Sequence, residues 1–334
     1  MSTRIAVLGA GSFGTCLALL AARSHDVTLW ARDAAVADAM QRERRNPKYL
    51  SEFALPASVR VCADLGEALA GRALVICAIP SHGVREVMRA AGALMDREAV
   101  VVSTVKGIEV ETSLLMHRVL EEVLPAHLRR RVVALSGPSF AREVAAGKPT
   151  AVTLACAEMS HAAFVQSALS SPAFRCYTHA DIVGVEVGGA LKNVVAIAVG
   201  MSDGLGTGLS ARAALMTRGL HEIARLGIAL GADPLTFLGL SGMGDLILTC
   251  TGDLSRNRTV GLELARGRSL SEIVASMNEV AEGVRTTYAA CGLATRLGME
   301  MPIATGLRAV LEGELAPAQV AKLLMSRQLK SERD

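Results

Sequence analysis

Lys192 is the residue in this chain whose position most needs a chemical explanation. It interrupts an apolar, helix-forming run at residues 188–197. An ammonium group in apolar surroundings is costly to desolvate unless it is paired or used. Burial also lowers the pKa of a lysine, which suits a proton donor that works near neutral pH. We therefore predict that Lys192 is catalytic; the alternative is a structural lysine that reaches solvent from the edge of the helix.

Lys106 is a second candidate because of the loop that it occupies. It follows the apolar run 100–103, and the small residues of 137–141 follow the run 132–135 in the same way. Ligands of open α/β sheets bind beside the carboxyl ends of the strands. We expect both loops to lie at a ligand site; the alternative is that they are ordinary surface loops.

A third cluster could bind a phosphate group. Residues 255–258 read Ser-Arg-Asn-Arg, and Ser255 is of a residue type that caps helices. An arginine and an asparagine beside a helix start suit a phosphate, because the side chains and the free backbone N–H groups all donate to its oxygens. The Gly-Met-Gly-Asp-Leu stretch at 242–246 belongs to the same cluster. The alternative is a solvated helix cap with surface charges.

A glycine-rich turn predicts a dinucleotide site. Gly9, Gly11 and Gly14 form a GxGxxG pattern directly after the apolar run 5–8 and before the helical run 15–23. In such a turn the first glycine allows a tight bend, the second lets the backbone approach a pyrophosphate, and the third lets helix and strand pack closely. The helix start then offers N–H groups to the phosphates. An ordinary glycine-rich turn would not require this strand and this helix around it.

Arg32 favours NADP(H) as the cofactor. It lies at the end of the second predicted strand, 18 residues after Gly14. An NAD-selective site usually has an acidic residue there, whereas an arginine can pair with the 2′-phosphate of NADP. Asp33 is the counter-argument, because its carboxylate could hold a ribose 2′-hydroxyl. We predict that NADP(H) is preferred and that NAD(H) can also bind; the alternative for Arg32 is a solvated charge at a strand end.

The elements that position these residues follow two different patterns. Short, mostly β-branched runs without strict alternation predict strands buried on both faces; they lie at residues 5–8, 27–30, 74–79, 100–103, 132–135, 151–155 and, as a weaker signal, 174–177. From residue 181 onward the apolar periodicity predicts helices only, at 182–200, 210–230, 284–297 and 303–311. Further helix starts are indicated at Asp233-Pro234, Ser269 and Pro317.

The predicted fold class is therefore α/β. Residues 1–179 are expected to form a Rossmann-type, doubly wound, mostly parallel sheet, and residues 180–334 an all-α domain. The length of 334 residues agrees with about two domains.

Composition excludes several other classes of protein. Apolar residues at 51% and charged residues at 20% permit a packed core and argue against disorder. A net charge of +3 and 3% aromatic residues argue against a nucleic-acid partner. The seven cysteines form no CxxC motif and the seven histidines no HxH or HxxxH pair, so we expect no disulfide framework, no metal site and a reducing cytoplasm.

We also expect no membrane insertion. The charge-free stretch 5–22 resembles the core of a signal peptide, but its three glycines would disrupt the apolar helix that such a core needs.

Several motifs occur in an order that is specific when they are taken together. They are Gly9-Ala10-Gly11-Ser12-Phe13-Gly14-Thr15, Val105-Lys106-Gly107, Ser136-Gly137-Pro138-Ser139-Phe140-Ala141, Gly188-Gly189-Ala190-Leu191-Lys192-Asn193, Met201-Ser202-Asp203-Gly204, Gly244-Asp245-Leu246 with Thr249-Cys250-Thr251, and Ser255-Arg256-Asn257-Arg258. Along nearly its whole length the chain resembles the bacterial NAD(P)-dependent glycerol-3-phosphate dehydrogenases.

This resemblance implies a reaction and a set of site residues. The reaction is the reversible hydride transfer between NAD(P)H and dihydroxyacetone phosphate that gives sn-glycerol 3-phosphate, a precursor of phospholipids. Lys192 would transfer the proton, Lys106 would lie between nicotinamide and substrate, and the enzyme would be a homodimer. Besides the three glycines, the implied cofactor contacts are Ser12, Phe13, Arg32, Lys106, Ala141, Arg256, Val280 and Glu282. The implied substrate contacts are Lys106, Gly137, Ser139, Lys192, Asp245, Ser255, Arg256 and Asn257.

Two other functions remain open from the sequence. One is another two-domain reductase, of the 3-hydroxyacid or 3-hydroxyacyl-CoA type, although such enzymes typically use a histidine or a differently placed lysine. The other is a nucleotide-sensing regulator without catalysis, which would not need Lys106 and Lys192 together. No helix-turn-helix with a basic recognition helix is recognisable in the sequence.

Overall fold

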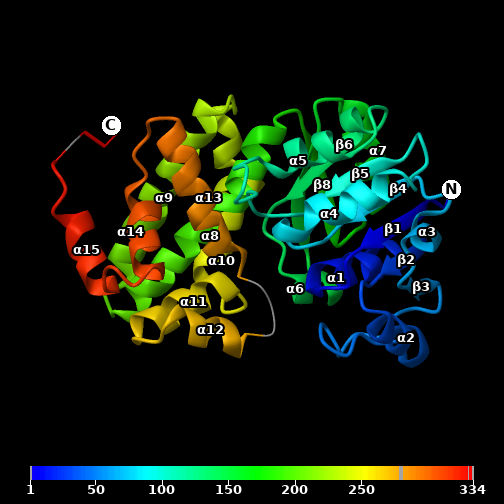
Figure 1. Cartoon of the computed structure of the whole chain (residues 1–334), viewed down its shortest axis with the longest axis horizontal. Coiled ribbons are helices and arrows are strands. Elements are labelled where there is room, and N and C mark those ends of the chain that lie inside the picture. Colours follow the sequence, from blue (N-terminus) through cyan, green and yellow to red (C-terminus); the bar gives the residue numbers. More distant parts are fainter. Residues whose placement is uncertain (1, 278–280, 330, 333–334) are drawn as a thin grey trace.

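The computed structural model describes residues 2–277, 281–329 and 331–332, which form a sheet-containing half and a helical half side by side (Figure 1). The described strands make one sheet of eight, in the order β3-β2-β1-β4-β5-β6-β7-β8. Their bounds are β1 Arg4–Leu8, β2 Asp26–Trp30, β3 Val59–Cys62, β4 Leu74–Cys77, β5 Val100–Ser103, β6 Val132–Ser136, β7 Thr150–Ala155 and β8 Phe174–His179. Neighbouring strands run parallel except β6 and β7, which are antiparallel. The prediction of a mostly parallel sheet is confirmed.

Helices cover both faces of the sheet. They are α1 Ser12–Ala21, α2 Ala34–Glu43, α3 Leu65–Leu69, α4 Ser81–Gly92, α5 Met116–Val123, α6 Ala141–Ala145 and α7 Met159–Leu169. One apolar cluster joins the sheet to α1, α2 and α7, through residues such as Leu17, Met40 and Val165. A second cluster joins the other face to α3, α4 and α5, through residues such as Leu69 and Met88. The inner strands β4, β5 and β6 are buried on both faces, which explains their continuous apolar runs, whereas the edge strands β3 and β8 expose residues such as Arg60 and Tyr177.

The strand order changes direction beside β1. From β1 the chain first adds β2 and β3 on one side, and then crosses to add β4, β5 and β6 on the other. At such a point the connections leave the sheet in opposite directions and open a crevice at the carboxyl ends of the strands. The glycine-rich turn follows β1 at this crevice.

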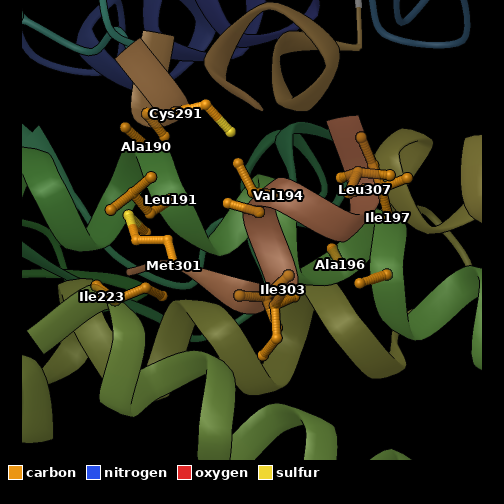
Figure 2. Close-up of a cluster of buried hydrophobic side chains, with 14 of the residues drawn as sticks. Ala190, Leu191, Val194, Ala196, Ile197, Ile223, Cys291, Met301, Ile303 and Leu307 are labelled. Atoms are coloured by element: carbon orange, nitrogen blue, oxygen red, sulfur yellow. The ribbon is translucent and has the colours of Figure 1, made fainter. Parts of the chain in front are cut away.

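The helical half is built around α8. Its helices are α8 Ile182–Gly204, α9 Leu209–Ala229, α10 Asp245–Thr251, α11 Arg256–Ala265, α12 Leu270–Ser276, α13 Glu282–Arg296, α14 Pro302–Leu311 and α15 Pro317–Met325. Figure 2 shows side chains of α8, such as Leu191 and Val194, among apolar side chains that include Ile223 of α9 and Ile303 of α14. By length and composition α8 could cross a membrane, but 89% of its most apolar window is buried inside the protein. We therefore describe α8 as the core helix of this half.

Two glycines let α8 and α11 touch backbone to backbone. A Cβ on Gly200 would lie 2.1 Å from the carbonyl oxygen of Arg258, and a Cβ on Gly261 would lie 2.0 Å from that of Ile197. Any larger residue would push the two helices apart. Because α11 begins at Arg256 and α8 carries Lys192, this contact fixes the predicted phosphate cluster relative to the predicted proton donor.

Two sequence predictions about elements are corrected by the structure. The edge strand β3, Val59–Cys62, was missed because it is only four residues long and contains an exposed arginine, Arg60. The start indicated at Asp233-Pro234 opens a 3₁₀ segment, Pro234–Leu238, instead of an α-helix. Phe237 is buried in this segment, but Leu235 and Leu238 are exposed and Gly239 follows directly, so the segment ends after five residues. The starts indicated at Ser269 and Pro317 are confirmed by α12 and α15.

Candidate active site

A cleft of about 880 Å³ lies between the sheet half and the helical half. Its lining brings together most of the residues predicted from sequence: Gly9, Gly11, Ser12, Phe13, Arg32, Lys106, Ser139, Ala141, Lys192, Ser255, Arg256, Asn257 and Glu282. Val280 lies outside the described residues. Gly14, Gly137 and Asp245 do not line the cleft, but each contacts a residue that does.

The glycine turn has the geometry that a dinucleotide needs. Gly9 has a φ of +113°, and a Cβ there would lie 2.5 Å from the carbonyl oxygen of Ala78. A Cβ on Gly14 would lie 1.8 Å from the carbonyl oxygen of Gly9, so this residue lets α1 pack closely on the turn. Nothing lies within 4 Å of a Cβ on Gly11, which lines the cleft where α1 begins. This open space beside a helix N-terminus fits a pyrophosphate group.

Two buried charged groups, Lys192 and Asp245, meet the half-buried Lys106 at the other end of the cleft. The ammonium of Lys192 donates to Oδ1 of Asp245 at 2.5 Å and to Oγ1 of Thr249 at 2.7 Å. The ammonium of Lys106 donates to Oδ2 of Asp245 at 2.6 Å and to the carbonyl oxygen of Gly137 at 2.9 Å. One carboxylate from α10 therefore joins a lysine of the sheet half to a lysine of α8. Since an ammonium has three N–H groups, each lysine keeps one donor for a ligand.

Burial and the neighbouring charges together shift the pKa values of Lys192 and Asp245. Burial lowers the pKa of Lys192 to about 8; Asp245 acts in the opposite direction and Lys106 adds to the lowering. For Asp245, burial alone would raise the pKa, but the two ammonium groups outweigh it and the pKa of the carboxyl is lowered. At neutral pH these three groups therefore hold two positive charges and one negative charge. Their net positive charge favours a neighbouring oxygen on which negative charge develops.

Two polar residues of the site, Thr249 and Asn193, stand in motifs of the family resemblance but were given no role from the sequence. Thr249 lies one helical turn after Asp245 and accepts from Lys192, and its hydroxyl also donates to the carbonyl oxygen of Asp245 at 2.6 Å. Asn193 donates to the carbonyl oxygen of Lys106 at 3.1 Å, so it links α8 to the loop after β5. The i, i+4 spacing of Asp245 and Thr249 on a helix is a signal that could have identified Thr249; the contact of Asn193 crosses between the two halves and has no local signal.

The predicted phosphate cluster lies at the start of α11. The hydroxyl of Ser255 caps the helix, accepting from the backbone N–H of Arg258 at 3.2 Å. Asn257 is buried, donates to Oδ1 of Asn193 at 2.9 Å, and accepts from the backbone N–H of Gly283 at 2.9 Å. The amide of Asn257 is thus largely engaged inside the protein. It connects the phosphate cluster to Asn193 and through it to Lys106.

Loops of the sheet half complete the site. Gly137 has a φ of +137°, and a Cβ there would lie 3.0 Å from Cα of Val152, so the turn that receives Lys106 requires a glycine. The hydroxyl of Ser139 donates to the same carbonyl oxygen, that of Gly137, at 2.9 Å.

Glu282 links the helical half to the sheet half. It lies on α13 and accepts from the backbone N–H of Ser81 at 2.9 Å and from the Ser81 hydroxyl at 2.6 Å, at the start of α4.

At the opposite end, Arg32 is exposed and lines the cleft. Asp33 caps α2, accepting from the backbone N–H of Val36 at 3.2 Å.

Within the described residues no group of three or more His, Cys, Asp or Glu side chains could hold a metal ion.

Comparison with known proteins identifies the family. The model of the NAD-dependent glycerol-3-phosphate dehydrogenase N-terminus matches residues 4–162, and that of the C-terminus matches residues 181–322. The chain belongs to the NAD-dependent glycerol-3-phosphate dehydrogenase family. It is 52% identical to the NAD(P)+ glycerol-3-phosphate dehydrogenase of Geobacter sp. strain M21 over 334 residues, which covers 99% of each chain.

Solved structures agree with this family. The glycerol-3-phosphate dehydrogenase of Coxiella burnetii has a TM-score of 0.93 at 38% identity, and the match covers 98% of this chain and 99% of that one. A ketopantoate reductase from Ralstonia eutropha JMP134 has a TM-score of 0.59 at 17% identity, covering 96% of this chain and 100% of that one. At that identity the likeness to the reductase concerns the fold alone, and it does not support the alternative of a hydroxyacid-type enzyme.

Proposed function

We propose that this member of the family is an sn-glycerol-3-phosphate:NAD(P)+ 2-oxidoreductase that interconverts dihydroxyacetone phosphate and sn-glycerol 3-phosphate. The observation that carries the proposal is the bridge Lys192–Asp245–Lys106, which lies in the same cleft as the glycine turn. The two matching family models and the relatives at about 50% identity support the same reaction. A nucleotide sensor would have no use for two lysines joined by one carboxylate in this cleft.

The proton in this reaction comes from Lys192. When bound, the reduced nicotinamide supplies the hydride that goes to C2 of the ketone. Negative charge then develops on the carbonyl oxygen, and the free N–H of the Lys192 ammonium donates its proton there. Asp245 and Thr249 hold the other two N–H groups and so fix the direction of the third. In the oxidation of glycerol 3-phosphate, neutral Lys192 accepts the proton from the hydroxyl.

Lys106 stabilises the developing charge. Its ammonium keeps one N–H free while Asp245 and Gly137 hold it in place. Because Lys106 is half-buried and held by the buried Asp245, this fixed positive charge acts on the carbonyl oxygen with less screening than it would have in water. Asp245 is a positioning residue here, since it joins both ammonium groups and does not itself contact the reacting carbon in this scheme.

Binding of the phosphate orients the ketone. Arg256, Ser255, Asn257 and the free N–H groups at the start of α11 are the proposed phosphate ligands, with Gly137 and Ser139 on the opposite loop. The phosphate is remote from C2, so its binding energy is used to hold the ketone in the reactive geometry. The proposed cofactor contacts are those named from the sequence, with NADP(H) preferred because Arg32 is exposed beside the cleft.

One assay tests the proposed reaction. Loss of NADPH absorbance on addition of dihydroxyacetone phosphate is expected, and unphosphorylated dihydroxyacetone is the matched control that should react far more slowly. Equal rates with the two ketones would contradict the proposed phosphate site. Absence of turnover with the phosphorylated ketone, together with turnover of a 2-oxo acid, would favour a hydroxyacid-type reductase.

We further propose two domains, residues 1–179 and 180–334, and a homodimer in the cytoplasm. The seven cysteines are all free and buried, which agrees with a reducing compartment. Sedimentation of the purified protein as a monomer only would contradict the dimer.

A further inference from the structure

Asn46 joins two walls of the cleft. It lies in the loop after α2 and is only 1% exposed. Its amide nitrogen donates to the carbonyl oxygen of Ala10, between the first two glycines of the turn, at 2.8 Å, and to the hydroxyl of Thr15 on α1 at 2.9 Å. Its carbonyl oxygen accepts from the backbone N–H groups of Lys48 at 3.0 Å and Tyr49 at 3.1 Å. One buried amide thus ties the glycine turn to the loop that carries Lys48.

The loop that Asn46 holds has a defined conformation. It is closed at its base by an antiparallel bridge between Arg45 and Ala54. Arg44 and Leu50 on either side of Asn46 have φ values of 56° and 53°, which side-chain-bearing residues rarely adopt. Such backbone persists only where the surroundings fix it. The hydrogen bonds of Asn46 are part of what fixes it, so Lys48 and Tyr49 are presented to the cleft in one arrangement.

The charges at this end of the cleft favour an anion. Arg32 and Lys48 both line the cleft and are both exposed, and in the part of the chain that the structure describes neither forms an ion pair or a side-chain hydrogen bond. The nearby carboxylates are engaged elsewhere. Glu52 pairs with Nε of Arg142 at 2.8 Å, and Asp33 caps α2. Two unpaired cations therefore lie beside the position at the end of β2 where the adenosine ribose of a dinucleotide binds.

We propose that Asn46 is a positioning residue for the cofactor and that the loop it holds provides Lys48 as a second cation, with Arg32, for the 2′-phosphate of NADP(H). This assignment rests on the proposed function, because it deepens the choice of cofactor. Arg32 comes from the end of β2 and Lys48 from the loop after α2, so the two charges approach the phosphate from different elements. Tyr49 follows Lys48 in the same held segment and lines the cleft with it.

Cofactor binding can be measured without any turnover. Trp30 is the single tryptophan of the chain and lines the cleft, so quenching of its fluorescence by NADPH or NADH reports binding at this site. The variants are Lys48→Met, Arg32→Met, Asn46→Asp and Asn46→Ala. The matched control is Lys322→Met, on exposed α15 at the opposite end of the molecule (Figure 1).

The variants of the two cations have distinct expected results. Lys48→Met and Arg32→Met should each raise the Kd of NADPH by about tenfold, the scale of one charge-assisted contact, and the Kd of NADH by less than about twofold. Lys322→Met should change neither Kd. An equal rise for NADPH and NADH in Lys48→Met, or no rise, would overturn the assignment of Lys48.

The Asn46 variants should weaken both cofactors. Asn46→Asp keeps the acceptor for Lys48 and Tyr49 but cannot donate to Ala10 and Thr15, and Asn46→Ala loses all four hydrogen bonds. We expect the Kd of NADPH and of NADH to rise, more in Asn46→Ala, while kcat at saturating cofactor and the KM of dihydroxyacetone phosphate stay within about twofold. A general loss of folding would instead lower kcat. Unchanged Kd values in Asn46→Asp, with an unchanged Tm, would overturn the positioning role.

The same titration separates failure of this inference from failure of the proposed function. Wild-type protein that binds NADPH but reduces no triose phosphate would overturn the proposed substrate and leave the comparison of Kd values intact. Wild-type protein that binds neither cofactor would overturn both.

Discussion

The two ends of the cleft hold charge in opposite ways. At the reaction end, Lys192 and Asp245 are 6% and 1% exposed and are joined to each other and to Lys106. At the ribose end, Arg32 and Lys48 are exposed and unpaired within the described residues. Buried charges interact strongly and shift one another's pKa, whereas exposed charges are screened by water and salt. The difference indicates that the reaction end is built for proton transfer and the ribose end for selective binding.

Removal of Lys192 should give the largest effect. Lys192→Ala should lower kcat by about 10²- to 10⁴-fold, because the proton donor of the ketone is lost. Stopped-flow or steady-state measurement of NADPH oxidation at saturating substrate checks this, with Lys322→Ala as the matched control. Near-normal turnover would show that the wrong lysine has been assigned.

Removal of the carboxylate between the lysines should lower the free energy of unfolding as well as kcat. Asp245→Asn keeps the size of the side chain but leaves the buried ammonium of Lys192 and the half-buried ammonium of Lys106 without a counter-charge. Breaking a buried ion pair in this way costs about 3–5 kcal/mol. Urea unfolding at pH 7 measures the loss, and Asp253→Asn, whose side chain is 98% exposed, is the control. A loss below about 1 kcal/mol would mean that the charges of the reaction end are as solvated as those of the ribose end.

Removal of Arg256 should act on substrate binding. Arg256→Ala is expected to raise the KM of dihydroxyacetone phosphate by about 10- to 100-fold, the scale of one or two hydrogen bonds to a charged group. The value of kcat should change less. An unchanged KM would refute the proposed phosphate site at the start of α11.

Salt concentration should affect the two ends of the cleft differently, and this is the smallest of the effects that we predict. Between about 0.05 and 0.5 M NaCl the screening length shortens severalfold, so the Kd of NADPH should rise by a few fold. Turnover at saturating ligands should change less, because the reaction end is buried. A larger salt effect on kcat than on the Kd of NADPH would reverse the comparison.

The parts that the sequence predicts well are those with local signals. Gly9, Gly11 and Gly14 stand in a fixed spacing between a strand and a helix, and Lys192 stands out because an apolar helix surrounds it. These signals involve neighbours along the chain, so they identified the dinucleotide turn and the unusual lysine, and they indicated most of the strands.

The features that the sequence could not predict depend on contacts between residues that are far apart in the chain. Asp245 meets Lys192 across 53 positions of the chain and Lys106 across 139. The sequence placed Asp245 in the predicted phosphate cluster, and nothing in the spacing indicates that its carboxylate joins both lysines. The sequence likewise predicts that Asn257 binds phosphate, but in the structure α11 packs on α8 and the amide of Asn257 donates to Asn193. Such contacts follow from tertiary packing, which residue types and spacing do not encode locally.

The central claim is that Lys192, with a pKa lowered to about 8, transfers the proton. It is tested most directly by the pH dependence of kcat/KM in both directions, because this quantity reports ionisation before the triose binds. Reduction needs the protonated amine, so kcat/KM for dihydroxyacetone phosphate should be level below about pH 8 and fall about tenfold per unit above it. Oxidation needs the neutral amine, so kcat/KM for glycerol 3-phosphate should rise up to about pH 8 and then level off. Profiles that bend in the same direction, or show no change near pH 8, would contradict the account.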